Sequence, residues 1–195
     1  DNLATNAAAV VEAFDRGQDD TRLCVLPLSH IYARTCDLYS WVFNGSRLVL
    51  AEGRETLARD LQIAKPHAIN AVPFLYQRIA DRIREAGGDE RTALRNFFGS
   101  RADMLNCGGA PLAPEVEAWY ADHGMPILIG YGLTETSPVV SISTQQAHRC
   151  GAVGKLLRDV EVRIADDGEI LVRGPNVMHG LWRNEEATNE LIIAG

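Results

Sequence analysis

The sequence lacks paired cysteines, long apolar runs and an excess of basic residues. No two of its four cysteines stand close enough to make a CxxC pair, so neither a zinc site nor a disulfide scaffold is indicated. We expect the thiols to be buried and reduced. No apolar run approaches the roughly 18 residues of a membrane span. No basic segment followed by an apolar one opens the chain, so neither a transmembrane segment nor a signal peptide is predicted.

The charge balance is acidic, with 19 basic and 26 acidic residues and a net charge of −7. Non-specific nucleic-acid binding needs a basic surface, so no nucleic-acid partner is expected. Hydrophobic residues make up 46% of the 195 positions, and a chain of this size buries about 70% of its unfolded surface on folding. These features predict a soluble, cytoplasmic globular protein.

Short apolar segments alternate with amphipathic ones along most of the chain. We predict strands near 23–26, 47–51, 68–72, 103–106 and 126–130, and helices near 3–14, 31–43, 54–64, 74–86, 92–98 and 115–123. This alternation is typical of an α/β fold in which a partial parallel sheet is layered with helices.

The pattern changes near residue 147. A β-hairpin is predicted over 160–173, where alternating side chains flank the turn Asp166-Asp167-Gly168, and a short helix is predicted over 184–191. We therefore divide the chain into a partial α/β core, residues 1–147, and part of a β-rich, distorted-barrel subdomain, residues 148–195.

Three polar turns follow three of the predicted strands. They are Pro27-Leu28-Ser29-His30, Gly108-Gly109-Ala110-Pro111 and Tyr131-Gly132-Leu133-Thr134-Glu135. In an open parallel sheet, ligands bind at the carboxyl ends of the strands, where such turns converge. The convergence predicts one shared binding site.

The third turn carries the strongest chemical signal. Its glycines let backbone approach a phosphate, Thr134 can bond a phosphate oxygen, and Glu135 can hold a hard cation. His30 can orient or polarise a carboxylate, although a histidine satisfied by a backbone carbonyl is the simpler alternative. The Gly108-Gly109 backbone can lie flat against a ring or a ribose, or it can simply make a tight turn.

The same turn does not fit a dinucleotide-binding fingerprint. Gly130-Tyr131-Gly132 provides G-x-G, but Glu135 occupies the position of the third glycine, which must allow close helix packing. About twenty residues later, where an acidic residue is required, the chain has Lys155.

Five segments occur in a distinctive order along the chain. They are Leu26–Tyr32 (LPLSHIY), Asn106–Leu112 (NCGGAPL), Tyr131–Pro138 (YGLTETSP), Gly151–Pro175 (GAVG followed by GEILVRGP) and Gly180–Thr188 (GLWRNEEAT). Together they resemble the LPLxHxY, GGAPL, YGxTE, GxVG…GEIxxxGP and GYxxNxEAT motifs of fatty-acyl-CoA synthetases, which belong to the AMP-forming adenylating superfamily. The resemblance extends over essentially the whole chain.

The resemblance implies a ligase that uses ATP, Mg²⁺ and CoA and activates a fatty acid through an acyl-adenylate. By this resemblance, Glu135 would hold Mg²⁺ and Thr134 would contact the α-phosphate. His30 would lie beside the acyl carboxylate, and Tyr32 and Arg34 would border the acyl pocket. The implied ATP/AMP-binding set is Gly108, Gly109, Ala110, Pro111, Tyr131, Gly132, Leu133 and Thr134.

The resemblance also implies parts that this sequence does not contain. A phosphate loop should precede Asn2, and a TGD motif and a domain carrying the catalytic lysine should follow Gly195. We therefore expect an internal fragment of the large N-terminal domain of a parent protein, inactive on its own. The resemblance is compatible with peripheral membrane contact by the parent protein. Arg34 and Arg158 stand where less charge is expected, which leaves the preferred acyl chain length open.

Two alternatives stay open at this stage. One is a related adenylating ligase for an aromatic or amino acid, with Tyr32 and Arg34 near its acyl group. The other belongs to a different class, a non-catalytic nucleotide-binding or scaffold protein.

Overall fold

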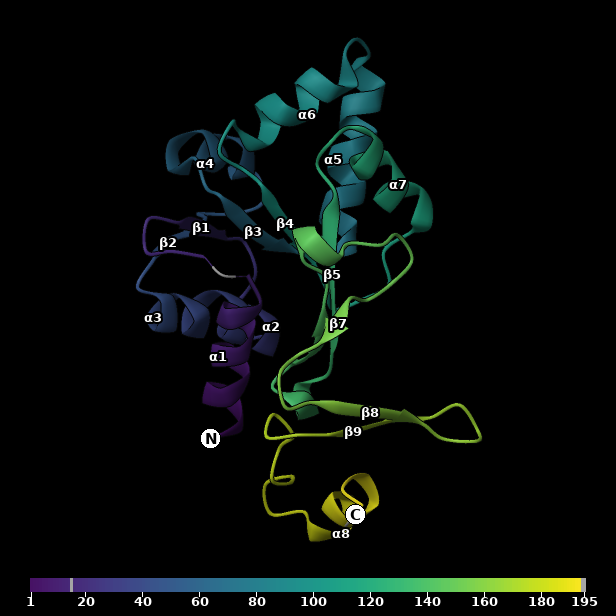
Figure 1. Ribbon diagram of the computed structural model, residues 1–195. Coiled ribbons are helices and arrows are strands. Elements are labelled where there is room, and N and C mark those ends of the chain that lie inside the picture. The colour runs from purple at the N-terminus through teal and green to yellow at the C-terminus, as the bar shows by residue number, and fades with distance from the viewer. Residues whose placement is uncertain (15, 194–195) are drawn as a thin grey trace.

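A seven-stranded sheet organises the chain (Figure 1). The computed structural model describes residues 1–14 and 16–193, so the last two residues of the predicted 148–195 part lie outside it. The strands are β1 (Thr21–Cys24), β2 (Arg47–Leu50), β3 (Ala68–Ala71), β4 (Met104–Cys107), β5 (Ile127–Gly132), β6 (Val139–Ile142) and β7 (Lys155–Leu156). Their order is β2-β1-β3-β4-β5-β6-β7. The first five pair in parallel, and β6 and β7 are antiparallel. The predicted α/β class is confirmed.

Helices cover both faces of this sheet. They are α1 (Asn2–Phe14), α2 (Ile31–Ala33), a π-helical segment (Arg34–Tyr39), α3 (Ser40–Asn44), α4 (Leu57–Ala64), α5 (Pro73–Ala86), α6 (Glu90–Phe98) and α7 (Pro114–Asp122). A further helix, α8 (Glu185–Leu191), lies apart from the sheet. Short 3₁₀ turns occupy Thr134–Thr136 and Gln145–Ala147. Helices α4 to α7 pack together on one face, as Figure 1 shows, and α1 packs on the other.

The alternation of buried side chains along the central strands explains this layering. Ile69, Leu105 and Ile127 belong to the large core under α4 to α7. Their neighbours Ala68, Met104 and Leu128 point to the opposite face and pack against Phe14 of α1. Strands that are buried on both faces read as continuous apolar runs, which is the pattern from which they were predicted.

The predicted helix over 31–43 is present, but its middle is wider than an α-helix. The segment Arg34–Tyr39 is π-helical, so three consecutive residues, Thr35, Cys36 and Asp37, are all buried. π-Helical turns are rare and often mark functional sites. Here the segment brings a carboxylate into the interior beside the sheet.

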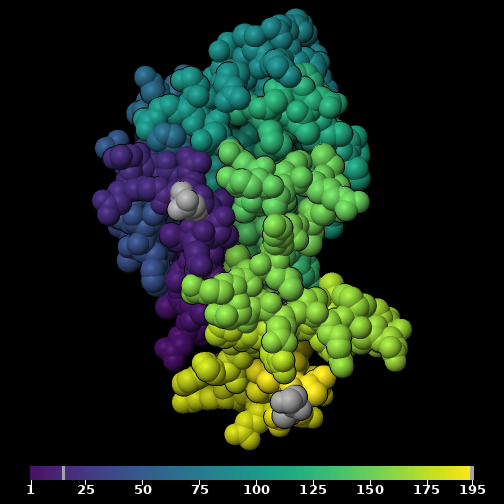
Figure 2. Space-filling view, in the orientation of Figure 1, coloured from purple at the N-terminus to yellow at the C-terminus, as the bar shows by residue number. Residues whose placement is uncertain are grey.

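The chain beyond β7 leaves the large sheet. Strands β8 (Glu161–Ile164) and β9 (Ile170–Arg173) form the predicted hairpin as a separate antiparallel pair, and α8 follows. Figure 2 shows these C-terminal residues gathered at one end of the molecule. The division near residue 147 stays a prediction, and β7 still pairs with β6. Among the described residues, no helix has both the length and the apolar character needed to cross a membrane.

Candidate functional site

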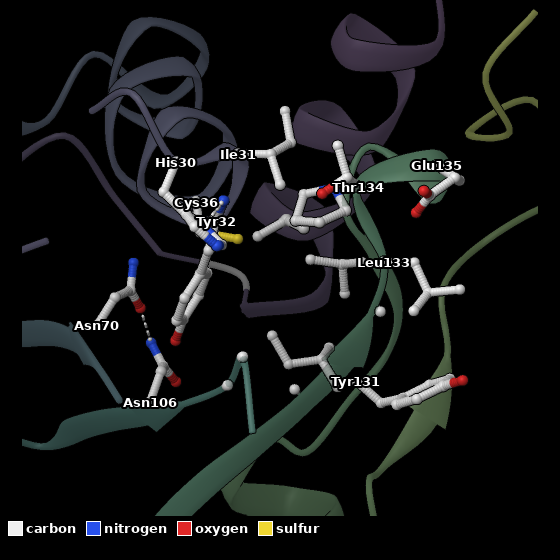
Figure 3. A pocket seen from close by; sticks show the side chains of 18 of the residues that line it. His30, Ile31, Tyr32, Cys36, Asn70, Asn106, Tyr131, Leu133, Thr134 and Glu135 are labelled. Atoms are coloured by element: carbon white, nitrogen blue, oxygen red, sulfur yellow. Dashed lines mark hydrogen bonds between the residues drawn. The ribbon is translucent and has the colours of Figure 1, made fainter. Parts of the chain in front are cut away.

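All three predicted turns border one cavity of about 270 Å³ at the carboxyl end of the parallel strands (Figure 3). The predicted site residues in its lining are His30, Tyr32, Gly108, Gly109, Tyr131, Gly132, Leu133, Thr134 and Glu135. The remaining predicted residues, Ala110, Pro111 and Arg34, are outside the lining and exposed. The Arg34 side chain instead donates from Nε to the carbonyl of Leu28 at 3.0 Å. Roles for these three residues stay predictions.

His30 is the N-cap of α2. Its Nδ1 accepts a hydrogen bond from the backbone N–H of Tyr32 at 3.1 Å. An accepting Nδ1 leaves the proton of a neutral imidazole on Nε2. The ring is exposed, so the helix cap fixes a tautomer whose Nε2–H can donate to a carboxylate oxygen.

Gly108 lets the second turn approach two other parts of the site. A Cβ at this position would lie 3.3 Å from the carbonyl oxygen of Gly130 and 3.4 Å from the Tyr32 ring. The next residue, Gly109, has a φ of +84°, which favours glycine. Burial raises the pKa of Tyr32 well above its ordinary value, so its hydroxyl keeps its proton.

The third turn is folded tightly back on β6. A Cβ on Gly132 would lie 1.7 Å from the carbonyl oxygen of Pro138, so a side chain cannot be accommodated there without movement. That carbonyl accepts hydrogen bonds from the N–H of Leu133 at 2.9 Å and from Oγ1 of Thr136 at 2.6 Å. These bonds fix the backbone that carries Thr134 and Glu135.

Side chains from distant segments hold the same turn in place. Asn6 of α1, fully buried, donates to the carbonyl of Val139 at 2.7 Å and accepts from its N–H at 3.1 Å. Thr35 donates to the carbonyl of Ser137 at 2.9 Å. From the C-terminal part, Asn176 donates to the carbonyl of Thr136 at 3.1 Å. The turn is therefore preorganised by its surroundings.

Thr134 and Glu135 lie on the opposite side of the cavity from Asn70 and Asn106, as Figure 3 shows. The backbone of Glu135 is held, because its carbonyl accepts from the N–H of Met178 at 2.8 Å. Within the described residues, its carboxylate takes part in none of the side-chain hydrogen bonds or ion pairs. One free carboxylate fits Mg²⁺, which usually keeps several waters and binds through one or two carboxylates and substrate phosphates.

A buried polar network along the inner wall was missed in the sequence. Asn106 donates to Oδ1 of Asn70 at 2.8 Å, and Asn70 donates to Oδ1 of Asp37 at 2.7 Å. Arg22 lies 3.8 Å from the same carboxylate oxygen. Burial raises the pKa of Asp37 to about 6, and the charge of Arg22 opposes this shift. Asn70 and Asn106 are partners in the β3–β4 register. Figure 3 shows the Tyr32 ring beside them.

This network gives the cavity a polar wall. Arg22, Asn70 and Asn106 all line it, and Oδ1 of Asn106 is buried without a partner among the described residues. The available signal in the sequence was an asparagine inside each of two apolar strands, since buried polar side chains require partners.

Comparisons with known proteins identify the family to which this chain is similar. The profile described as AMP-binding enzyme matches residues 1–182. The chain is 45% identical over 102 residues to the long-chain-fatty-acid–CoA ligase FadD15 of Mycobacterium bovis, covering 52% of this chain and 17% of that protein. It is 29% identical over 208 aligned positions to the feruloyl-CoA synthase of Amycolatopsis sp, covering all of this chain and 40% of that one.

A solved structure shows the same fold. A malonyl-CoA ligase in a ternary product complex with methylmalonyl-CoA and AMP superposes with a TM-score of 0.79 at 28% identity, covering 97% of this chain and 42% of that one. The chain thus spans less than half the length of each of these similar proteins.

Proposed function

Since the chain belongs to the AMP-binding enzyme family, we propose that it supplies the nucleotide and acyl walls of a ligase that joins a carboxylic acid to CoA through an acyl-adenylate. The observation that carries this proposal is the meeting of three glycine-bearing or histidine-bearing turns around one cavity. The substrates would be ATP, CoA and the acid, and we place the enzyme in the cytoplasm, where ATP and CoA are available.

Each residue's position in the cavity suggests a separate role in the reaction. Nε2–H of His30 would orient the acid's carboxylate. The Thr134 hydroxyl would donate a hydrogen bond to the α-phosphate, which the carboxylate attacks. Glu135 would hold Mg²⁺, which neutralises phosphate charge when it is bound. Holding two reactants in line lowers the barrier mainly by positioning and by stabilising charge. The backbone of Gly108 and Gly109, with Tyr131, would border the adenine.

A fatty acid is the first candidate for the acid, since FadD15 of M. bovis is named for long-chain fatty acids and is 45% identical over its aligned part. The polar wall of Asn70 and Asn106 favours a second candidate, an aromatic or other acid that carries a hydrogen-bonding group. A plain alkyl chain against this wall would leave the unpartnered Oδ1 of Asn106 unsatisfied.

Pyrophosphate release by the full-length natural protein tests the proposal. The protein is given ATP, Mg²⁺, CoA and, in turn, a long-chain fatty acid, a hydroxycinnamic acid and malonic acid. We expect release with at least one acid, and the acid that works best identifies the acyl class. Release with none of a broad acid panel would contradict the ligase proposal.

Glu135→Gln tests the assigned metal role. It should lower kcat about 100-fold, as expected when one stabiliser of developing charge is removed. Glu169→Gln, at the exposed turn of the β8–β9 hairpin, is the matched control and should keep full activity. We also expect the 195-residue chain alone to release no pyrophosphate.

A further inference from the structure

Three potential metal ligands meet outside the cavity. Glu117 of α7, His148 and Cys150 each offer one ligand atom, and these atoms all lie within 4.8 Å of one another. None of the three residues belongs to the lining of the cavity described above. Figure 1 shows the chain after β6 passing beside α7, which brings His148 and Cys150 to the helix.

Two of these ligand atoms are buried and unsatisfied. Oε1 of Glu117 and Nε2 of His148 have no hydrogen-bond partner among the described residues. They lie 3.6 Å apart, which is too long for a hydrogen bond. Glu117 itself is only 4% exposed. Leaving two polar atoms buried and unpaired is unfavourable, and a cation bound between them would satisfy both.

The backbone around the site holds the ligands in place. Oε2 of Glu117 accepts a hydrogen bond from the N–H of Gly151 at 3.0 Å, so the carboxylate is already oriented by its second oxygen. Gly154 lies directly on β6, since a Cβ there would be 2.0 Å from the carbonyl carbon of Ile142. The loop that carries His148 and Cys150 is thus fixed at both α7 and the sheet.

We propose that Glu117, His148 and Cys150 bind one Zn²⁺ ion. A thiolate, an imidazole and a carboxylate form a ligand set that zinc accepts, whereas Mg²⁺ and Ca²⁺ prefer oxygen ligands alone. The Cys150 thiol gives its proton to solvent on binding. Cys24, Cys36 and Cys107 are buried as expected, but the expectation of a buried thiol is wrong for Cys150, which is exposed. The fourth position of a tetrahedral ion therefore faces solvent and takes a water. The ion ties the loop after the 3₁₀ turn Gln145–Ala147 to α7.

Cobalt and zinc titrations of the full-length natural protein, after removal of metals, test this proposal. We expect one equivalent of Co²⁺ to give a thiolate-to-cobalt charge-transfer band, and one equivalent of Zn²⁺ to abolish it. Zinc affinity is measured by competition with a chromogenic chelator. Loss of a supporting group alone lowers metal affinity about 10- to 100-fold, so Cys150→Ser and His148→Gln should each lower zinc affinity at least about 100-fold.

Matched variants guard against unspecific effects. Glu115→Gln changes an exposed glutamate on the same helix, and His179→Gln changes an exposed histidine elsewhere. Both should bind zinc as the unmodified protein does. Cys150→Ser alters an exposed residue, so its fold can be confirmed by circular dichroism before titration. The proposal is overturned if Co²⁺ gives no thiolate band, or if zinc affinity is unchanged in Cys150→Ser.

Discussion

Gly132→Ala should disrupt the third turn, because the added Cβ would lie 1.7 Å from the carbonyl oxygen of Pro138. That oxygen must withdraw by about 1.5 Å to reach normal contact. It would then lose its hydrogen bonds from Leu133 and Thr136. Two such bonds contribute about 1 kcal/mol each, and overpacking costs about 1–3 kcal/mol more. We expect a loss of about 3–5 kcal/mol in the free energy of unfolding.

Gly130→Ala is the matched control on the same strand. A Cβ at Gly130 would lie 3.8 Å from Cγ1 of Ile142, which is ordinary contact. For a domain of this size, about 3–5 kcal/mol corresponds to a Tm lower by about 6–20 °C. Calorimetry should therefore show a lower Tm and a lower affinity for AMP in Gly132→Ala. Both quantities should be largely preserved in Gly130→Ala.

The reasoning is refuted if the two alanine variants unfold at the same temperature and bind AMP equally well. That result would mean that the backbone of the turn yields at little cost and is not held by the contacts around Pro138.

Two further predictions concern the buried polar groups. Asn6→Ala removes both hydrogen bonds to Val139 and should lower the free energy of unfolding by about 2–3 kcal/mol. The control Asn2→Ala loses one partly exposed hydrogen bond and should lower it by about 1 kcal/mol or less. Urea unfolding measures both. Asp37 has a folded pKa of about 6, above its ordinary 3.8. Between about pH 4 and pH 6 its carboxyl therefore ionises in the unfolded chain first, and the free energy of unfolding falls as pH rises, by up to roughly 3 kcal/mol. Asp37→Asn should remove this decline, and an unchanged pH profile of urea midpoints would contradict the assignment.

The position of the site was predictable because the topology decides it. The carboxyl ends of parallel strands meet at one edge of a sheet, so the turns at His30, Gly108 and Glu135 had to converge once the strands were recognised. The helices were predictable from apolar spacing and from their ends, as at Pro73 and Gly87 of α5.

What was missed depends on pairings between distant residues. Strand β6 was not among the predicted strands, because its pairing requires the close approach of Gly132 to Pro138, which no local pattern reveals. Asn70 and Asn106 become neighbours only through the β3–β4 register. The absence of a CxxC pair indicated no zinc site; the proposed ligands Glu117, His148 and Cys150 come together only because a helix and a distant loop meet.

The supports of the third turn come from both ends of the chain. Asn6 leaves the ribosome before the strands of the large sheet, whereas Asn176 and Met178 emerge only after β7 has been synthesised. During translation, the backbone carbonyls of Glu135 and Thr136 therefore lack their hydrogen bonds from Met178 and Asn176 until those residues have been synthesised. The segment that carries Thr134 and Glu135 therefore reaches its final shape near the end of synthesis of this part of the protein, so a nascent chain can complete the large sheet before the proposed nucleotide site is formed.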